Sequence, residues 1–141
     1  MGMDAEFDQQ DLDKLIPRVK KALQNAHDLT AKELWGNLME FSPQDHGRLA
    51  GSWKLQRVGA MESTVGTSVE YALVQNDGSD PYMIYPRGAK ALRFEIGGGV
   101  IYAKSVRHPG IQGTHYIEGS IAATESRIPE FIEMALAQEG L

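Results

Sequence analysis

The chain has 141 residues, a formal net charge of −5 and no cysteine. Without cysteine it has no disulfide framework, no thiolate zinc site and no thiol nucleophile. Its length fits one globular domain, residues 1–141, that is large enough to bury most of its apolar surface. The negative charge argues against wrapping nucleic acid, and the lack of an apolar run of about 20 residues argues against a membrane span.

The N-terminal region is predicted to be a flexible acidic arm followed by a long helix. Residues 1–10 lack the basic and apolar regions of a signal peptide, so we expect none. Between Leu12 and Phe41, apolar residues recur at steps of three and four, the spacing of one helical face. Because proline is well tolerated in a first turn, we expect the main helix to start near Pro17, the alternative being a helix that bends there. The helix should end before Ser42-Pro43, since a residue that precedes proline avoids the helical conformation.

Two β-hairpins are predicted in the middle of the chain. Alternation within residues 53–69, around a turn near Gly59, indicates the first. In the second, Leu92, Phe94 and Ile96 alternate with charged residues, so one face should be buried and the other solvated. Three successive glycines then supply the turn into the returning strand.

The remaining segments complete an α+β fold. Residues 69–77 are ambiguous between a strand and one helical turn, and Pro109-Gly110 fits a type II turn. The tail from Tyr116 is predicted to be helical and divided at Pro129. We therefore expect a long N-terminal helix packed on an antiparallel sheet of four to five strands, plus a C-terminal helix.

The stretch SPQDHGRLAGSW, residues 42–53, contains the residue types of a catalytic site. A hydrolase would use Asp45, His46 and Ser52, but the side chains of adjacent Asp45 and His46 diverge and no nucleophile elbow surrounds either serine. We therefore expect a structural loop with no catalytic residue. The side chains expected to point inward are Leu49 and Trp53.

Metal and phosphate sites are not expected either. His108 and His115 flank a Pro-Gly turn, yet they belong to no zinc signature. The glycines at 97–99 open a strand, whereas a phosphate cradle opens a helix. No metal ion and no cofactor is predicted.

Charge is distributed unevenly along the chain. Residues 81–113 contain five basic residues and one acidic residue, a net charge of +4, whereas residues 114–141 contain one basic and five acidic residues, a net charge of −4. This order suits docking against copies of the chain or against charged neighbours, and an unevenly charged solvated surface is the alternative. Tyrosines interleave with the basic residues, and both types anchor interfaces, although half-buried sheet tyrosines are as compatible with the pattern. The predicted partner-contact residues are Asp45, Arg48, Arg87, Lys90, Arg93, Lys104, Arg107 and His108.

Four segments occur in an order that is similar to one protein family. PQDHGRLAGS (43–52) follows the predicted helix, and VGT (65–67) precedes Tyr71-Ala72 and Gly78. KALRF (90–94) and AKSVRHPG (103–110) come next. The set, which spans roughly residues 10–136, resembles the neck or tail-completion proteins of long-tailed bacteriophages, the gene-product-ten-like family. His46 stands where that family usually has Thr, and Gly113 to Tyr116 replaces a Pro-aromatic step.

The resemblance implies a non-enzymatic virion protein of the head–tail junction or the tail end, present in the host bacterial cytoplasm during assembly. It implies a ring of identical subunits, with six as the expected number, and no membrane association. The implied partners are other neck, portal-adaptor or tail-tube proteins, with DNA passing through the ring lumen. Two alternatives from other classes are a small hydrolase that uses Asp45, His46 and Ser52, and a nucleic-acid-binding adaptor.

Overall fold

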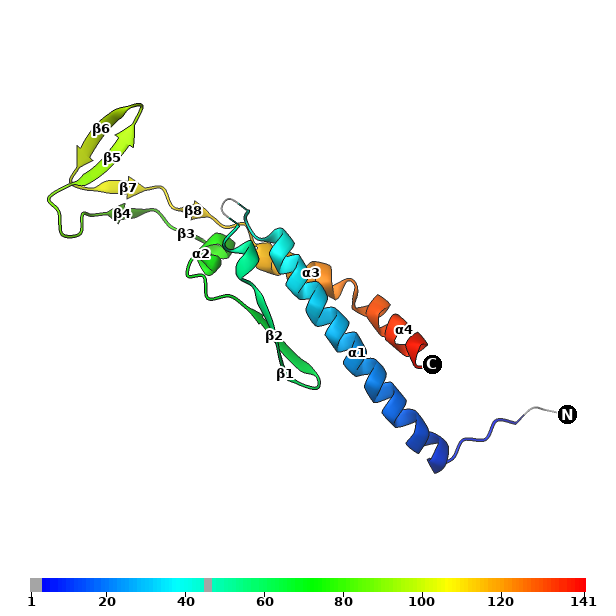
Figure 1. Ribbon diagram of the computed structural model, residues 1–141. Coiled ribbons are helices and arrows are strands. Elements are labelled where there is room, and N and C mark those ends of the chain that lie inside the picture. The colour runs from blue at the N-terminus through cyan, green and yellow to red at the C-terminus, as the bar shows by residue number, and fades with distance from the viewer. Residues whose placement is uncertain (1–3, 45–46) are drawn as a thin grey trace. The chain divides into compact units, whose positions relative to one another are not determined.

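The computed structural model describes residues 4–44 and 47–141, and their contacts divide the chain into two compact units (Figure 1). The helical unit comprises the chain up to Val69 together with Tyr116–Leu141. The ribbon unit comprises Glu70–His115. Residues 1–141 were expected to form one domain, and the structure distinguishes these two parts within them. No helix in the described ranges is long and apolar enough to cross a membrane.

Helix α1, Gln9–Phe41, starts earlier than predicted. The Asp11 N–H donates to the Asp8 carboxylate and the Asp8 N–H donates to the Asp11 carboxylate, both at 3.0 Å. This reciprocal cap satisfies backbone donors at the helix start, so the helix begins well before Pro17, which lies inside it. The predicted start near Pro17 is therefore wrong, because the capped turn at Asp8 begins the helix and Pro17 is accommodated inside it.

Both ends of α1 can be compared with the prediction. Of the predicted acidic arm, residues 1–3 lie outside the described residues, residues 4–8 form no helix or strand, and the last two residues belong to α1. At the other end Ser42 is extended, with a ψ angle of 142°, directly before Pro43. The predicted end of the helix is thus confirmed.

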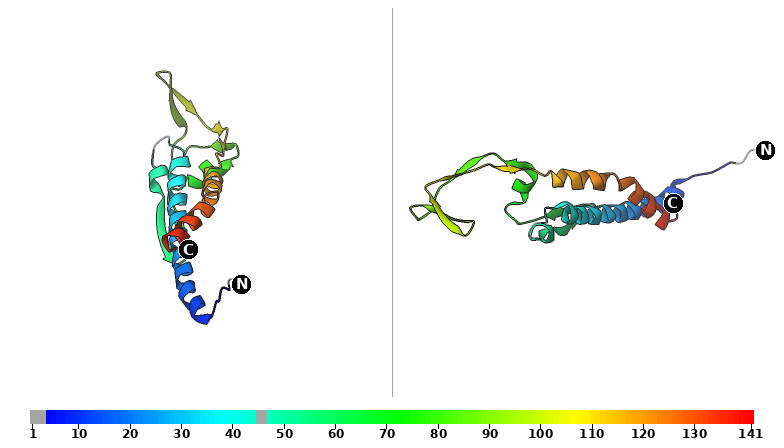
Figure 2. Two further views of the ribbon diagram at one scale, coloured as in Figure 1. Left: turned by 90° about the vertical axis from the view of Figure 1, so that its right-hand side faces the viewer. Right: turned by 90° about the horizontal axis from the view of Figure 1, so that it is seen from above.

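The helical unit is built by packing two C-terminal helices along α1 (Figure 2). Helix α3 spans Tyr116–Glu125 and helix α4 spans Ile128–Gln138, with Pro129 in the first turn of α4. The predicted division of the tail at this proline is confirmed. Small side chains let α1 and α4 approach closely and form the core. The core members are Ala22, Ala26 and Ala135, with Ile132 and Leu136 packed against them.

Arg127 ties the start of α4 to α1. Its guanidinium contacts the Glu130 carboxylate at 3.1 Å and the Glu33 carboxylate on α1 at 2.9 Å, and it lies over the Phe131 ring. The hydrogen bond from Arg127, helped by its charge, lowers the pKa of Glu130. Hydrogen bonds to Glu130 and Glu33 raise the pKa of Arg127, which stays charged at every physiological pH.

The first predicted hairpin is confirmed within the helical unit. Strands β1, Lys54–Gly59, and β2, Glu62–Gly66, pair antiparallel, and both contact α1. The His27 ring Nε2 on α1 lies 2.9 Å from the Ser63 hydroxyl on β2. The helix therefore covers this two-stranded sheet, as expected for the cover of a sheet.

The ribbon unit consists of short strand pairs and one helix. Helix α2, Ala72–Asp77, settles the ambiguous segment as helical. The pairs, all antiparallel, are β3 (Gly78–Ser79) with β8 (Ile111–Gln112), β4 (Tyr82–Ile84) with β7 (Val106–His108), and β5 (Leu92–Ile96) with β6 (Gly99–Ala103). The second predicted hairpin, β5–β6, is confirmed, as is the α+β class. The strands form four two-stranded sheets, β1–β2 included, in place of one sheet of four to five strands.

A clasp formed by Gln75, Asn76 and residues 113–115 joins the two passes of the chain at the base of the ribbon unit. The Thr114 N–H donates to the Gln75 carbonyl and the His115 N–H donates to the Asn76 carbonyl, both at 3.0 Å. Asn76 is buried, and a Cβ atom on Gly113 would lie 2.6 Å from its carbonyl oxygen. Gly113 is therefore required for this close backbone approach.

Candidate partner-contact surface

The stretch at residues 42–53 folds as a packed corner between α1 and β1. Ser42 and Trp53 are buried, and the Trp53 indole Nε1 donates to the Ser42 hydroxyl at 2.8 Å. That hydroxyl in turn donates to the Leu38 carbonyl. Leu49 is 2% exposed, directly before a short 3-10 turn at Ala50–Ser52. The inward positions of Leu49 and Trp53 are confirmed, and the described part of the stretch packs helix against strand.

The residues of the hydrolase alternative are described only in part. Asp45, which is also a predicted partner-contact residue, and His46 lie outside the described residues. Ser52 Oγ lies 2.6 Å from the Leu49 carbonyl and 2.5 Å from the Thr67 hydroxyl. Arg48 is exposed just before the turn. The described partners of Ser52 thus join the 3-10 turn to the segment after β2.

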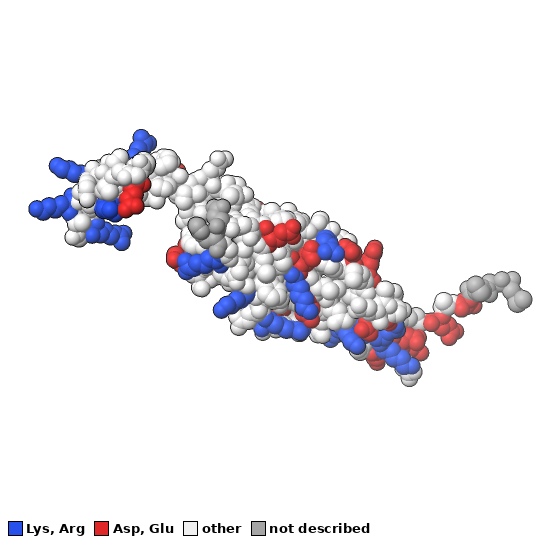
Figure 3. Space-filling model, turned by 45° about the horizontal axis from the view of Figure 1, so that its top comes forward, with Lys and Arg blue, Asp and Glu red and all other residues white. Residues whose placement is uncertain are grey.

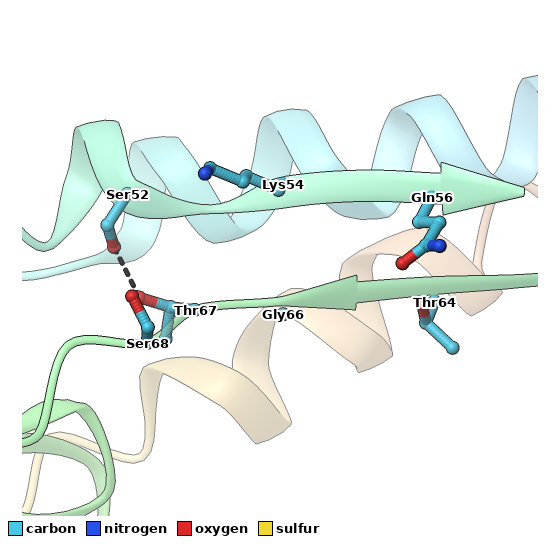
Figure 4. Close-up of a pocket in the computed structure, with 7 residues that line it drawn as sticks. All are labelled: Ser52, Lys54, Gln56, Thr64, Gly66, Thr67 and Ser68. Atoms are coloured by element: carbon cyan, nitrogen blue, oxygen red, sulfur yellow. Dashed lines mark hydrogen bonds between the residues drawn. The ribbon is translucent and has the colours of Figure 1, made fainter.

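A polar hollow of about 300 Å³ lies on one side of the β1–β2 hairpin (Figure 4). Its lining is rich in hydroxyl groups and contains one cation and no histidine or carboxylate, so it offers hydrogen bonds and a single positive charge. The lining residues are Ser52, Lys54, Gln56, Thr64, Gly66, Thr67 and Ser68. Lys54 is the one ionisable side chain among these lining residues.

The histidines flanking the Pro-Gly turn have structural contacts. The His108 ring stacks on Tyr82, with ring centroids 4.7 Å apart, and its Nδ1 accepts the Gly110 N–H at 3.0 Å. Gly110 has a φ angle of +87°, as the predicted type II turn requires. His115 belongs to the clasp. Within the described ranges, no three His, Cys, Asp or Glu side chains come together as metal ligands.

Apart from Arg48, which lies in the helical unit, the predicted Lys and Arg contact residues lie on the ribbon unit and are exposed (Figure 3). Arg93 lies on β5 opposite Tyr102 and forms an ion pair with Glu95 at 3.0 Å. No such partner lies near the other four among the described residues. These four are Arg87 and Lys90, between β4 and β5; Lys104, just after β6; and Arg107, on β7. Four positive charges of this unit are therefore available to a partner.

The apolar side chains of the ribbon unit are available as well. From Gly78 to His115, a fully described segment, no residue is buried. Tyr82, Tyr85 and Tyr102 are 48%, 63% and 66% exposed, whereas Tyr116 belongs to the core of the helical unit. Tyr82, Tyr85 and Tyr102 are therefore the exposed tyrosines, and Tyr71 is half-buried.

The β5–β6 hairpin has one apolar face that the sequence predicted to be buried. Leu92 lies opposite Ala103, Phe94 opposite Ile101 and Ile96 opposite Gly99, and directly opposed residues share a face. Ile96 is 64% exposed and Ile101 is 50% exposed. The prediction of a buried face is wrong for Ile96, because alternation tells which residues share a face and not whether another element covers it. We call Leu92, Phe94, Ile96, Ile101 and Ala103 the hairpin face.

The exposed hairpin face, the three tyrosines and the unpaired basic residues make the ribbon unit the surface best suited to contact a partner. The sequence indicates the cations of this surface but not the exposure of Ile96 and Ile101. The available signal is an alternating strand pair with no neighbouring amphipathic segment to cover it. Compared with known proteins, the chain matches no protein-family model, no curated protein and no solved structure.

Proposed function

We propose that this chain is a non-enzymatic structural protein of the bacteriophage neck or tail end, acting in tail completion and head–tail joining. In this proposal it assembles into a ring of identical subunits, with six as the expected number. The ring would join neck, portal-adaptor or tail-tube proteins, and DNA would pass through its lumen. The protein would be present in the host bacterial cytoplasm during assembly and then in the virion.

The observation that carries the proposal is the lack of any buried residue between Gly78 and His115. An isolated two-stranded hairpin is marginally stable in water, since it has too little apolar surface to bury. A segment that nevertheless exposes Ile96, Ile101 and three tyrosines gains most when a neighbouring protein covers it. A subunit of a larger assembly has such a neighbouring protein.

The residues that carry the family resemblance support a scaffold role. Gly47, in the first segment, has a φ angle of +67°, and Ser42 and Trp53 close the corner around that segment. In the last segment His108 and Gly110 stabilise a turn. The described residues of these segments thus shape turns and packing, which is what a scaffold requires of them.

The function is tested in the phage or prophage that encodes the chain. We expect deletion of the gene to give filled heads and separate tails in electron micrographs, and the protein to be found in purified wild-type virions by mass spectrometry. Complementation with the intact gene is the control. Normal joined virions after deletion, or flanking genes that encode no portal, capsid or tail-tube protein, would contradict the proposal.

One observation favours a second candidate, the nucleic-acid-binding adaptor. Four unpaired cations and three exposed tyrosines together match the composition of a surface on which nucleic acid binds and bases stack. This candidate predicts DNA binding that weakens steeply with salt, measured by fluorescence anisotropy with a labelled oligonucleotide. Reversal of Arg107 and Lys104 should abolish that binding, and binding that is indifferent to salt would rule the candidate out.

A further inference from the structure

The hairpin face needs a cover that combines apolar and acidic groups. Its most exposed apolar side chains are Ile101, in the middle pair of the hairpin, and Ile96, beside the turn. Lys90 precedes β5 and Lys104 follows β6, so cations stand at the base of the same hairpin, and neither has an ion-pair partner among the described residues. A partner that presents carboxylates around an apolar stripe would cover the isoleucines and neutralise the lysines together.

The helical unit has such a stripe on the exposed side of α3 and α4. In α3 the exposed residues recur at helical spacing, and Ile121 is 42% exposed. In α4, Met134 is 44% exposed. The opposite side of the two helices contains the buried residues Ser120, Thr124, Phe131 and Ala135. We call the exposed set the acidic helix face; it comprises Glu118, Ile121, Ala122, Glu125, Pro129, Glu133, Met134 and Ala137.

Charge makes the two faces complementary. Residues 114–141 have a net charge of −4 and residues 81–113 a net charge of +4. On the acidic helix face, Glu125 and Glu133 have no ion pair among the described residues, whereas Glu130 beside them is engaged by Arg127. One face thus presents apolar side chains beside unpaired carboxylates, and the other presents apolar side chains on a hairpin whose base carries two unpaired ammonium groups.

We propose that the hairpin face of one copy docks on the acidic helix face of a second copy. The two faces are different patches of one chain, so the contact is heterologous and repeats from subunit to subunit until a ring closes. This inference rests on the proposed function, because it names the contact by which the ring would form. It excludes a symmetric dimer in which hairpin packs on hairpin.

Single engineered cysteines test the contact directly, since the chain has no cysteine of its own. We expect a mixture of the Ile101→Cys and Met134→Cys variants to form a mixed disulfide-linked dimer on mild oxidation, because bridged Cα atoms must come within about 7 Å. The Ile101→Cys and Val58→Cys mixture is the matched control, since Val58 is exposed and apolar on β1 and belongs to neither face. A mixed yield no higher than that of the control overturns the proposal.

The double variant Ile101→Cys/Met134→Cys separates contact between copies from contact within one chain. A disulfide-linked monomer, with no linked dimers in the mixture of single variants, would mean that the hairpin covers its own helices and would overturn the proposal. Dimers linked through Ile101→Cys alone would favour hairpin on hairpin and would overturn it too. If binding of duplex DNA to the ribbon unit abolished the mixed dimer, DNA and not a second copy would cover the hairpin face, which would also overturn the proposal.

Charge reversal gives a second, independent readout. Lys90→Glu/Lys104→Glu and Glu125→Lys/Glu133→Lys should each weaken self-association of the full chain by about tenfold or more, because like charges then face each other. A mixture of the two variants restores complementary pairs and should associate as the wild type does, measured by sedimentation velocity. A mixture that stays as weak as its components would overturn the contact. If virions contain the protein and assemble normally with either pair of substitutions, the proposed contact between copies is wrong and the proposed function stands.

Discussion

The helical unit and the ribbon unit use side chains in opposite ways. In the helical unit Ala22, Ala26 and Ala135 are almost fully buried, and Trp53 and Tyr116 pack edge to face 6.3 Å apart. In the ribbon unit burial is confined to α2, where Ala72 and Asn76 are covered, and the strands beyond it bury nothing. The first unit has a core of its own, whereas the strands of the second are joined by backbone pairing with no buried side chain among them.

The same contrast holds for charge. In the helical unit Arg127 has two carboxylate partners and an aromatic ring, and Arg57 on β1 forms an ion pair with Asp28 at 3.4 Å. In the ribbon unit four of the five basic residues have no partner among the described residues. Charges in the first unit join its own elements, whereas most of those in the second have no such partner within the described chain. Four predictions test this difference.

The largest effect is expected at Trp53. Trp53→Ala should lower the free energy of unfolding by about 3–5 kcal/mol, because it removes a large buried side chain from the helical unit. Urea denaturation followed by far-ultraviolet circular dichroism measures this. The matched variant Tyr102→Ala removes an aromatic ring that is 66% exposed and should change stability by less than about 0.5 kcal/mol. Equal losses in the free energy of unfolding at the two sites would contradict the difference in packing between the units.

The next effect is expected at Gly78, next to the clasp. Its φ of +82° and ψ of −178° belong to a region that only glycine occupies readily, and a Cβ there would lie 2.5 Å from the Ile111 carbonyl oxygen. Gly78→Ala should therefore destabilise the base of the ribbon unit by about 2–4 kcal/mol. The readout is faster hydrogen exchange of the Thr114 and His115 amides. Gly88→Ala, with φ of +73° and open space around it, should leave these two amides protected.

A smaller effect is expected at Ser42. Ser42→Ala leaves the buried Trp53 indole N–H without its acceptor, which should cost about 1–2 kcal/mol. Thermal and urea denaturation measure the loss. Ser126→Ala is the control, since its exposed hydroxyl bonds only the Ala123 carbonyl and its removal should be close to neutral. If both variants were neutral, the corner at residues 42–53 would not depend on that hydrogen bond.

The smallest effect is expected at Glu130 and depends on pH. Because Arg127 lowers the pKa of Glu130 in the folded protein, this carboxylate stabilises the fold above its ordinary pKa, and the stabilisation disappears as the pH falls through the lowered value. The melting temperature of Glu130→Gln should be slightly below that of the wild type at neutral pH and equal to it in acid. Glu40→Gln, which removes no ion pair among the described residues and belongs to neither proposed contact face, is the control and should leave the melting temperature at neutral pH unchanged. A difference in melting temperature between Glu130→Gln and the wild type that grows as the pH falls would contradict this prediction.

Local signals predicted much of the helical unit. The three- and four-residue spacing located α1, and Pro43 and Pro129 marked boundaries that the structure confirms. The start of α1 was missed although its signal, an Asp at position 8 and another at 11, is present in the sequence. A helix cap is a local feature, so this pair of aspartates is enough to locate the start of α1 ahead of Pro17.

The ribbon unit was harder to predict because its pairing is not local. Tyr82 pairs with His108 and Gly78 with Gln112 through strands of three or two residues, too short for alternation to be recognised. The β5–β6 hairpin was predictable because three glycines join its strands. The exposure of Ile96 was not, since it depends on the absence of a covering element. For the candidate surface, the sequence located the cations and the structure added the uncovered apolar side chains.

The clasp has a consequence for how such a protein can diversify. The chain enters the ribbon segment beside Asn76 and returns to the same place at Gly113, where backbone meets backbone. The segment between these points can change in length and in side chains while its two ends stay joined. Substitutions or insertions in this segment can therefore accumulate while the helices keep their own core.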